Sequence, residues 1–162
     1  MDVDVLSEIA IDRPCGEVAA FSSDPDNVPA WYVNIKTVKW RTPSLVRVGS
    51  QIAFVAHFLG RRMAYTYEVV ELVPGERFVA WTAEGPFPME TTYTWDSTAN
   101  GTTRMTLRNR GMPKGFSMFV APFMGWAVRR ANQKDLAMLK EVLPAAPASC
   151  QERPECLRAC GG

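Results

Sequence analysis

Between residues 35 and 110 lie six segments in which apolar and polar residues alternate, and this feature restricts the fold more than any other. The segments span residues 35–42, 50–59, 61–73, 76–84, 88–96 and 101–110. Short Gly-, Pro- or Asn-containing breaks separate them. Strict alternation is typical of strands with one buried face, and short breaks favour turns between neighbouring strands. The pattern therefore predicts a meandering antiparallel sheet.

Helical patterns stand on either side of this region. Residues 3–11 alternate like a further strand, and Pro14 precedes a short helix. A second short helix is expected to end near Trp31. From residue 114 to 143 apolar residues recur every three or four positions, which predicts one long helix. Only that helix is large enough to cover the apolar face of the sheet, so we expect a curved sheet with a void beneath the helix.

The bulk properties exclude several classes of protein. The chain has 162 residues, a formal net charge of +1 and 47% hydrophobic residues, which is typical of one globular domain. We expect a single domain over residues 1–143 and a flexible tail over 144–162. The tail cysteines lack a usual zinc spacing, so no metal or cofactor is expected. Without a basic patch, signal peptide or apolar span, we expect a cytoplasmic protein without nucleic acid or stable membrane insertion.

Four stretches resemble a known superfamily: IAIDRPCGEVAAFSSDPDNVPAW, FLGRRMAYTYEVVELVPGERFVAW, GPFPMETTYTW and TRMTLRNRG. The chain resembles the START/SRPBCC, birch-pollen-allergen-like superfamily, and within it the bacterial polyketide cyclase/dehydrase and lipid-transport group. The resemblance implies an α+β helix-grip fold: a curved antiparallel seven-stranded sheet wrapped around a long C-terminal helix, with two short helices after strand 1. Members of the group include aromatase/cyclases, carriers and proteins without known activity.

The strand faces indicate which residues would line the void. Tyr65, Tyr67 and Tyr93 fall on inward registers, and buried phenols need hydrogen-bond partners that a solvent-containing cavity supplies. A packed core is the alternative for the same positions. The candidate ligand-binding residues are Trp31, Tyr65, Tyr67, Thr91, Tyr93, Asn109, Phe116, Phe119, Phe123, Val128 and Asn132.

The stretch GFSMFVAPFMGW, residues 115–126, has no charge and four large aromatic side chains. In helix-grip proteins the front of the last helix, with the loop before it, covers the cavity, so the resemblance implies that Phe116, Phe119, Val120, Phe123 and Met124 face inward or across its mouth as a lid. A plain core helix and a membrane or partner contact are the alternatives.

Three functions remain open. The first is binding of a hydrophobic small molecule, such as a lipid, polyketide or aromatic metabolite, by a monomer or homodimer. The second is a polyketide cyclase or dehydratase, in which Arg61 and Tyr65 would be the catalytic residues, as the resemblance implies. The single histidine, His57, is expected to face solvent. The third is a protein-interaction module that uses Trp40 and Trp81 on the outer sheet face.

Overall fold

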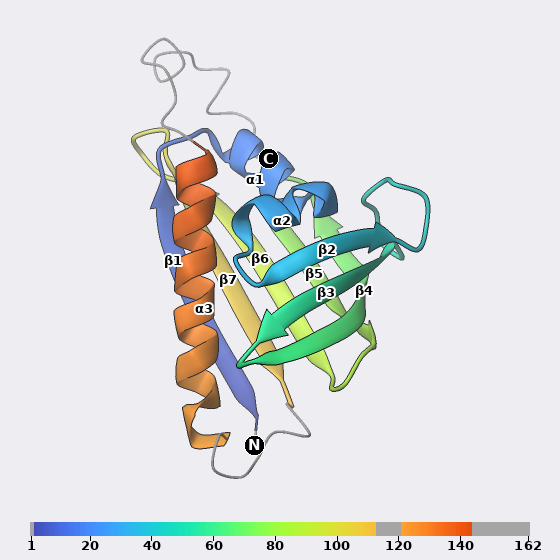
Figure 1. The fold of residues 1–162 in the computed structure, drawn as a ribbon. Helices are drawn as coiled ribbons and strands as arrows, with labels where there is room; N and C mark the ends of the chain where they lie inside the picture. The colour runs from blue at the N-terminus through green and yellow to red at the C-terminus, as the bar shows by residue number, and fades with distance from the viewer. Residues whose placement is uncertain (1, 113–120, 144–162) are drawn as a thin grey trace.

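The computed structural model describes residues 2–112 and 121–143. Seven antiparallel strands form one sheet in the order β1-β7-β6-β5-β4-β3-β2, and a long helix lies against it (Figure 1). The strands are β1 (Val3–Ile11), β2 (Ile35–Trp40), β3 (Gln51–Phe58), β4 (Arg61–Val73), β5 (Arg77–Glu84), β6 (Met89–Ser97) and β7 (Thr103–Gly111). The helices are α1 (Cys15–Ser23), η1 (Pro25–Asn27), α2 (Val28–Trp31) and α3 (Ala121–Val142).

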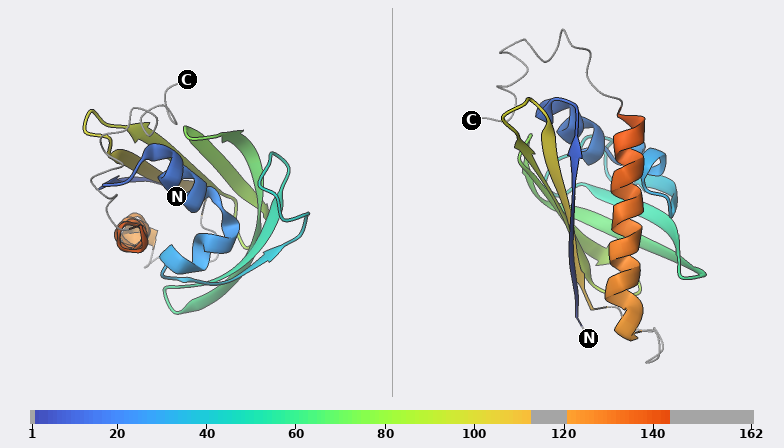
Figure 2. Two further views of the ribbon diagram at one scale, coloured as in Figure 1. Left: turned by 90° about the horizontal axis from the view of Figure 1, so that it is seen from above. Right: turned by 90° about the vertical axis from the view of Figure 1, so that its left-hand side faces the viewer.

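The sheet is curved, and all helices lie on its concave side (Figure 2). Because β1 pairs with β7, the first and last strands are neighbours and α3 packs along β1. The short helices α1 and α2 cover the other part of the concave side. The predicted helix-grip fold is thus confirmed, and the seven strands lie within two residues of their predicted ends. The predicted first turns of the last helix, residues 114–120, lie outside the described residues.

A tight turn fixes the register of the two strands that carry most of the aromatic residues. β3 and β4 are joined by Leu59 and Gly60, whose φ angles are 49° and 73°. Two successive positive φ values are typical of the type I′ hairpin turn, which matches the twist of antiparallel strands. The turn pairs Phe58 with Arg61 and so sends Tyr65 and Tyr67 to the concave side.

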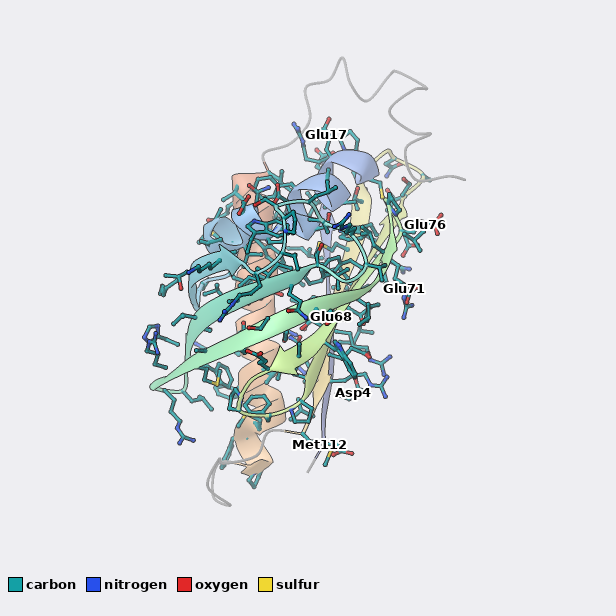
Figure 3. All side chains as sticks on the ribbon, turned by 90° about the vertical axis from the view of Figure 1, so that its right-hand side faces the viewer. Asp4, Glu17, Glu68, Glu71, Glu76 and Met112 are labelled. Carbon is teal, nitrogen blue, oxygen red and sulfur yellow. The ribbon has the colours of Figure 1, made fainter. Side chains whose placement is uncertain are left out.

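The two faces of the sheet differ in chemistry. On β7, Met105 and Leu107 are fully buried on the inner face, which packs against the helices, while Arg104 and Arg110 are exposed on the outer face. Ion pairs join neighbouring strands on the outer face, where Figure 3 shows Asp4, Glu68 and Glu71. These pairs are Arg108–Asp4, Arg110–Glu90, Arg104–Asp96 and Arg77–Glu71. Charged cross-strand pairs are typical of a solvated sheet face.

The expected position of Trp40 on the outer face is wrong. The pairing of β2 with β3 shifts between Ile35 and Thr37, and this bulge reverses the alternation that follows it. Trp40 is therefore half-buried against the core, and its Nε1 donates a hydrogen bond to Asp26 Oδ1 at 2.9 Å. Trp81 does lie exposed, at 53%.

The inward stripe of α3 is confirmed, but Phe123 does not belong to it. Met124, Val128 and Asn132 are buried, whereas Phe123 is 66% exposed. Neighbouring helical positions differ by about 100° in direction, so the inward position of Met124 turns Phe123 outward. Phe116 and Phe119, the other aromatic residues of the expected lid, lie outside the described residues.

Candidate functional site

A cavity of about 130 Å³ lies between the concave face of the sheet and α3. Its walls are mostly apolar and aromatic, with a few polar groups. The strands, the α2–β2 connection and the β5–β6 turn contribute Val3, Tyr32, Asn34, Ile35, Phe54, Ala56, Phe58, Met63, Tyr65, Tyr67, Phe87, Met89, Thr91, Tyr93 and Asn109. The helices contribute Val28, Met124, Val128, Ala131, Asn132 and Asp135. The predicted void is therefore present, and Tyr65, Tyr67, Thr91, Tyr93, Asn109, Val128 and Asn132 lie around it.

Aromatic rings form the sheet side of the cavity. Tyr65 lies 5.0 Å from Tyr67 and 5.6 Å from Phe54, measured between ring centroids. Tyr93 is stacked on Phe78 at 5.2 Å. Trp31 packs behind this wall against Tyr93, with no exposed surface, so it supports the cavity without lining it.

A chain of hydrogen bonds crosses from the sheet to α3. The hydroxyl of Thr91 donates to Asn109 Oδ1 at 2.7 Å and lies 3.1 Å from the Tyr67 hydroxyl. Asn109 Nδ2 then donates to Asn132 Oδ1 at 2.8 Å. Because the hydroxyl proton of Thr91 is used on Asn109, Tyr67 is the donor to Thr91. The chain holds the Asn132 amide in a single orientation.

The last side chain in this series of hydrogen bonds, Asn132, has an unpaired donor. Asn132 is 2% exposed and lines the cavity, yet its Nδ2 has no hydrogen-bond partner among the residues that the structure describes. The other unpaired buried side-chain atoms belong to Ser7, Arg13 and Trp31, which do not line the cavity. A buried donor without a partner costs free energy, and a bound molecule can supply the missing acceptor.

Asp135, which the sequence analysis did not single out, also lines the cavity. It is 3% exposed, and its Oδ1 accepts a hydrogen bond from the backbone N–H of Val33 at 2.9 Å. Burial raises the pKa of this carboxyl to about 7, although the Val33 N–H and the charge of Lys134 act in the opposite direction. Its place seven residues after Val128 and four before Leu139 was the signal that it faces inward.

The phenols of the cavity stay protonated at neutral pH. Burial raises the pKa of Tyr67 to about 12, and it raises the pKa values of Tyr32, Tyr65 and Tyr93 as well. The hydroxyls of Tyr32 and Tyr93 lie 2.7 Å apart. These side chains therefore act as neutral hydrogen-bonding groups rather than as phenolates.

Arg61, the other residue predicted to be catalytic, is exposed at the start of β4 and does not line the cavity. Tyr65 follows four residues later, which corresponds to about 13 Å along a strand. One small chemical group cannot touch both side chains. His57 is exposed on β3, as expected from its register.

Smaller and larger hollows adjoin the cavity or the short helices. One of about 80 Å³ shares Met63, Tyr65, Tyr67, Phe87 and Met89 with the cavity and extends toward the β5–β6 turn. Another, of about 510 Å³, is a groove between α1 and the 43–48 segment, with exposed residues at its rim and Trp40 on one wall. The groove is larger, but its lining includes none of the unpaired buried polar atoms found among the described residues. The cavity under α3 is therefore the stronger candidate site.

The described part of the chain offers neither a cluster of metal ligands nor a helix that could span a membrane. Over residues 2–112 and 121–143, no three His, Cys, Asp or Glu side chains gather closely enough to hold a metal ion. Within the same ranges no helix has the length and apolar character needed to cross a membrane.

Comparisons with known proteins agree with this architecture. A family model described as polyketide cyclase / dehydrase and lipid transport matches residues 2–144. No curated protein matches the sequence.

Solved structures with the same fold come from bacteria and plants. The Zhui aromatase/cyclase from Streptomyces sp. R1128 has a TM-score of 0.75 and 11% identity, over 88% of this chain and 94% of that one. A START superfamily protein from Mycobacterium smegmatis has a TM-score of 0.74 and 12% identity, over 86% of this chain and 96% of that one. Ginseng major latex-like protein 151 from Panax ginseng has a TM-score of 0.70 and 12% identity, over 88% of this chain and 97% of that one.

Proposed function

Because the chain belongs to the polyketide cyclase/dehydrase and lipid transport family, we propose that it binds a hydrophobic small molecule in the cavity between the sheet and α3. The observation that carries the proposal is the unpaired Nδ2 of Asn132, buried in the wall of a mostly apolar cavity. Convergence of a few polar groups in an apolar pocket is typical of small-molecule sites.

The size of the cavity indicates which part of a ligand it takes. An apolar cavity of about 150 Å³ can hold one benzene molecule. The cavity under α3 has about 130 Å³, so it accommodates one six-membered ring or a short chain of similar volume. The adjoining hollow under the β5–β6 turn gives a longer ligand a place for a second group once Met63 or Met89 changes rotamer.

A matched pair of alanines on α3 tests the proposal. Ala131 lines the cavity, while Ala137 is exposed on the same helix. Ala131→Leu fills part of the cavity, and Ala137→Leu adds the same atoms in solvent; both residue types favour helix. With ethylbenzene as the probe, calorimetric titration is expected to show binding to the wild type and to Ala137→Leu, and binding weakened about tenfold or more in Ala131→Leu. Equal binding to all three proteins, or none to the wild type, would contradict the proposal.

Catalysis on a carbonyl compound is the second candidate. The match to a family that includes cyclases and the position of the Tyr65 phenol in the cavity wall favour it. A protonated phenol can donate a proton to a carbonyl oxygen, and Arg61 would touch a more distant part of a long substrate. In this case a linear polyketone is expected to be converted, with the rate reduced in Arg61→Ala and Tyr65→Phe. No conversion by the folded wild type would remove this candidate.

Location and assembly belong to the same proposal. We propose a protein that works in the cytoplasm as a monomer or homodimer, and the balanced net charge of +1 and the paired charges of the outer face support its working without nucleic acid. Cell fractionation and light scattering of the purified protein test these two points.

A further inference from the structure

Two polar side chains of α3 face the cavity one turn apart. Asn132 and Asp135 are separated by three residues, so they lie on the same helix face, and both are at least nine-tenths buried. We propose that Asn132 and a protonated Asp135 together hold an acceptor oxygen of the ligand, such as a ketone or ester carbonyl. This inference rests on the proposed binding function and names the chemical group that the site selects.

The first donor is the Asn132 amide, and a hydrogen bond within the protein determines which of its atoms is left for a ligand. Asn109 Nδ2 occupies Asn132 Oδ1, so the Asn132 group left for a ligand is Nδ2, which carries two N–H donors. An apolar ligand leaves those donors unsatisfied, whereas a carbonyl oxygen accepts one of them. Because leaving a buried donor unpaired costs more than pairing it gains, this position discriminates strongly between the two ligands.

The second donor comes from the surroundings of Asp135. The backbone N–H of Val33 binds Oδ1, so a proton on Oδ2 can serve a ligand. No Lys, Arg or His is among the described residues that line the cavity, and no other acid lines it. The groups that act on the carboxyl electrostatically are the phenols of Tyr32, Tyr65 and Tyr93, and the charge of Lys134 on the same helix.

An ionised carboxylate is energetically unfavourable when it is buried in a cavity wall whose described residues include no cationic side chain. This cost agrees with the raised pKa of Asp135. Below a pH of about 7 the carboxyl is protonated and donates to the ligand oxygen. Above that pH it is ionised and can only accept, so it repels a carbonyl oxygen and favours a ligand hydroxyl. Selection between carbonyl and hydroxyl ligands is therefore expected to change with pH.

Three single-ring compounds of nearly equal size separate these effects: acetophenone, 1-phenylethanol and ethylbenzene. They carry a carbonyl, a hydroxyl and no polar group, respectively. At a pH of about 6 we expect the wild type to bind acetophenone about tenfold more tightly than ethylbenzene. At a pH of about 8.5 this advantage is expected to fall about threefold or more, while 1-phenylethanol gains relative to acetophenone.

Two variants assign the effects to the two side chains, and calorimetry on the full chain measures them. Asp135→Asn keeps a donor and the Val33 contact, so it is expected to retain the preference for acetophenone and lose its pH dependence. Asn132→Leu is expected to bind ethylbenzene and lose most of the preference. Glu141→Gln, which neutralises an exposed acid on the same helix, is expected to behave like the wild type.

The wild-type measurement alone can overturn the inference, even if a variant fails to fold. If ethylbenzene and acetophenone bind equally at both pH values, the acceptor-oxygen site is wrong while the binding function stands. If the preference is present but does not change with pH, or changes equally in Asp135→Asn, the role of Asp135 is wrong. If none of the three compounds binds, the proposed function itself fails.

Discussion

Leu107 and Arg108 are neighbours on β7, yet one belongs to the inner face of the sheet and the other to the outer face. Leu107 is fully buried in the core cluster that includes Leu136 of α3, whereas Arg108 is paired with Asp4 in solvent. The same contrast holds for acids. Burial raises the pKa of Asp135, while the hydrogen bond from Arg108 lowers the pKa of Asp4.

The contrast shows that the two faces of the sheet accommodate polar groups in different ways. On the inner face, polar groups are few and buried, and the chain of hydrogen bonds through Thr91, Asn109 and Asn132 leaves one donor unpaired among the described residues. On the outer face they are many, exposed and paired with opposite charges. Changes on the inner face should therefore affect stability and binding strongly, and matched changes on the outer face weakly.

Truncation of the two β7 neighbours should give the largest difference. Leu107→Ala leaves a cavity in the core and is expected to lower the free energy of unfolding by about 2–5 kcal/mol. Arg108→Ala removes an exposed ion pair and is expected to cost far less, because solvent screens such pairs. Urea denaturation measures both, and equal losses would break the comparison.

The pH dependence of stability should come next. The pKa of Asp135 is raised from 3.8 to about 7, so the folded protein keeps a proton that the unfolded chain loses. The resulting stabilisation is complete below the unfolded pKa and is lost as pH rises through the folded pKa, a drop on the order of 2–4 kcal/mol in the unfolding free energy. Asp4, with its lowered pKa, contributes in the opposite sense, because its stabilisation is lost at acid pH.

Asp135→Asn is expected to flatten the fall between about pH 4 and pH 7, the interval between the unfolded and folded pKa values of Asp135, because Asn does not titrate. Denaturant titrations at a series of pH values measure the change. An identical fall in the variant would assign it to other groups.

A smaller difference in unfolding free energy is expected between two threonines, one on each face of the sheet. Thr91→Val removes the donor to Asn109 and the acceptor for Tyr67, at an expected cost of about 1–2 kcal/mol in unfolding free energy. The Thr106 hydroxyl is hydrogen-bonded to that of Thr94 on the outer face, and Thr106→Val is expected to cost about 0.5 kcal/mol or less. The two variants have the same shape change, so a reversed order would contradict the importance of the inner chain.

The smallest effect is expected at Trp81. Its side chain is 53% exposed on the outer face, so Trp81→Ala should change the unfolding free energy by about 0.5 kcal/mol or less and leave ethylbenzene binding unchanged. A pull-down of the same variant from cell extract tests the alternative of an interaction module. Loss of a partner in Trp81→Ala with normal binding in the cavity would give the outer face a function of its own.

Much of the fold was predictable from the sequence because strand alternation and turn residues are local signals. Gly60, for example, marks a turn that the backbone does place in the left-handed region. Trp40 was placed on the wrong face because strict alternation was continued from Ile35, whereas the consecutive polar residues Lys36 and Thr37 coincide with a bulge that shifts the inward positions to Val38 and Trp40. Phe123 was included in the lid because of the resemblance, whereas the spacing of apolar residues along the helix selects its neighbour Met124 as the inward residue, which is buried.

The site was predictable in part for a related reason. Tyr65, Tyr67 and Tyr93 followed from alternation, and Asn132 stood out as an amide on an apolar stripe. Asp135 was missed because an acid on a helix is usually a surface residue. Its burial depends on the N–H of Val33, a hundred residues away in sequence, and on the phenols that surround it. Such contacts arise only from the assembled fold.

The most direct test of the account is an NMR titration of the protein with acetophenone at a pH of about 6. The side-chain amide resonances of Asn132, assigned by their absence in Asn132→Leu, report on the inner face. The indole N–H of Trp81 reports on the outer face. We predict that the Asn132 amide protons shift as acetophenone saturates the protein while the Trp81 indole stays unchanged. A shift of Trp81 with no change at Asn132 would contradict the claim that the cavity under α3 is the binding site.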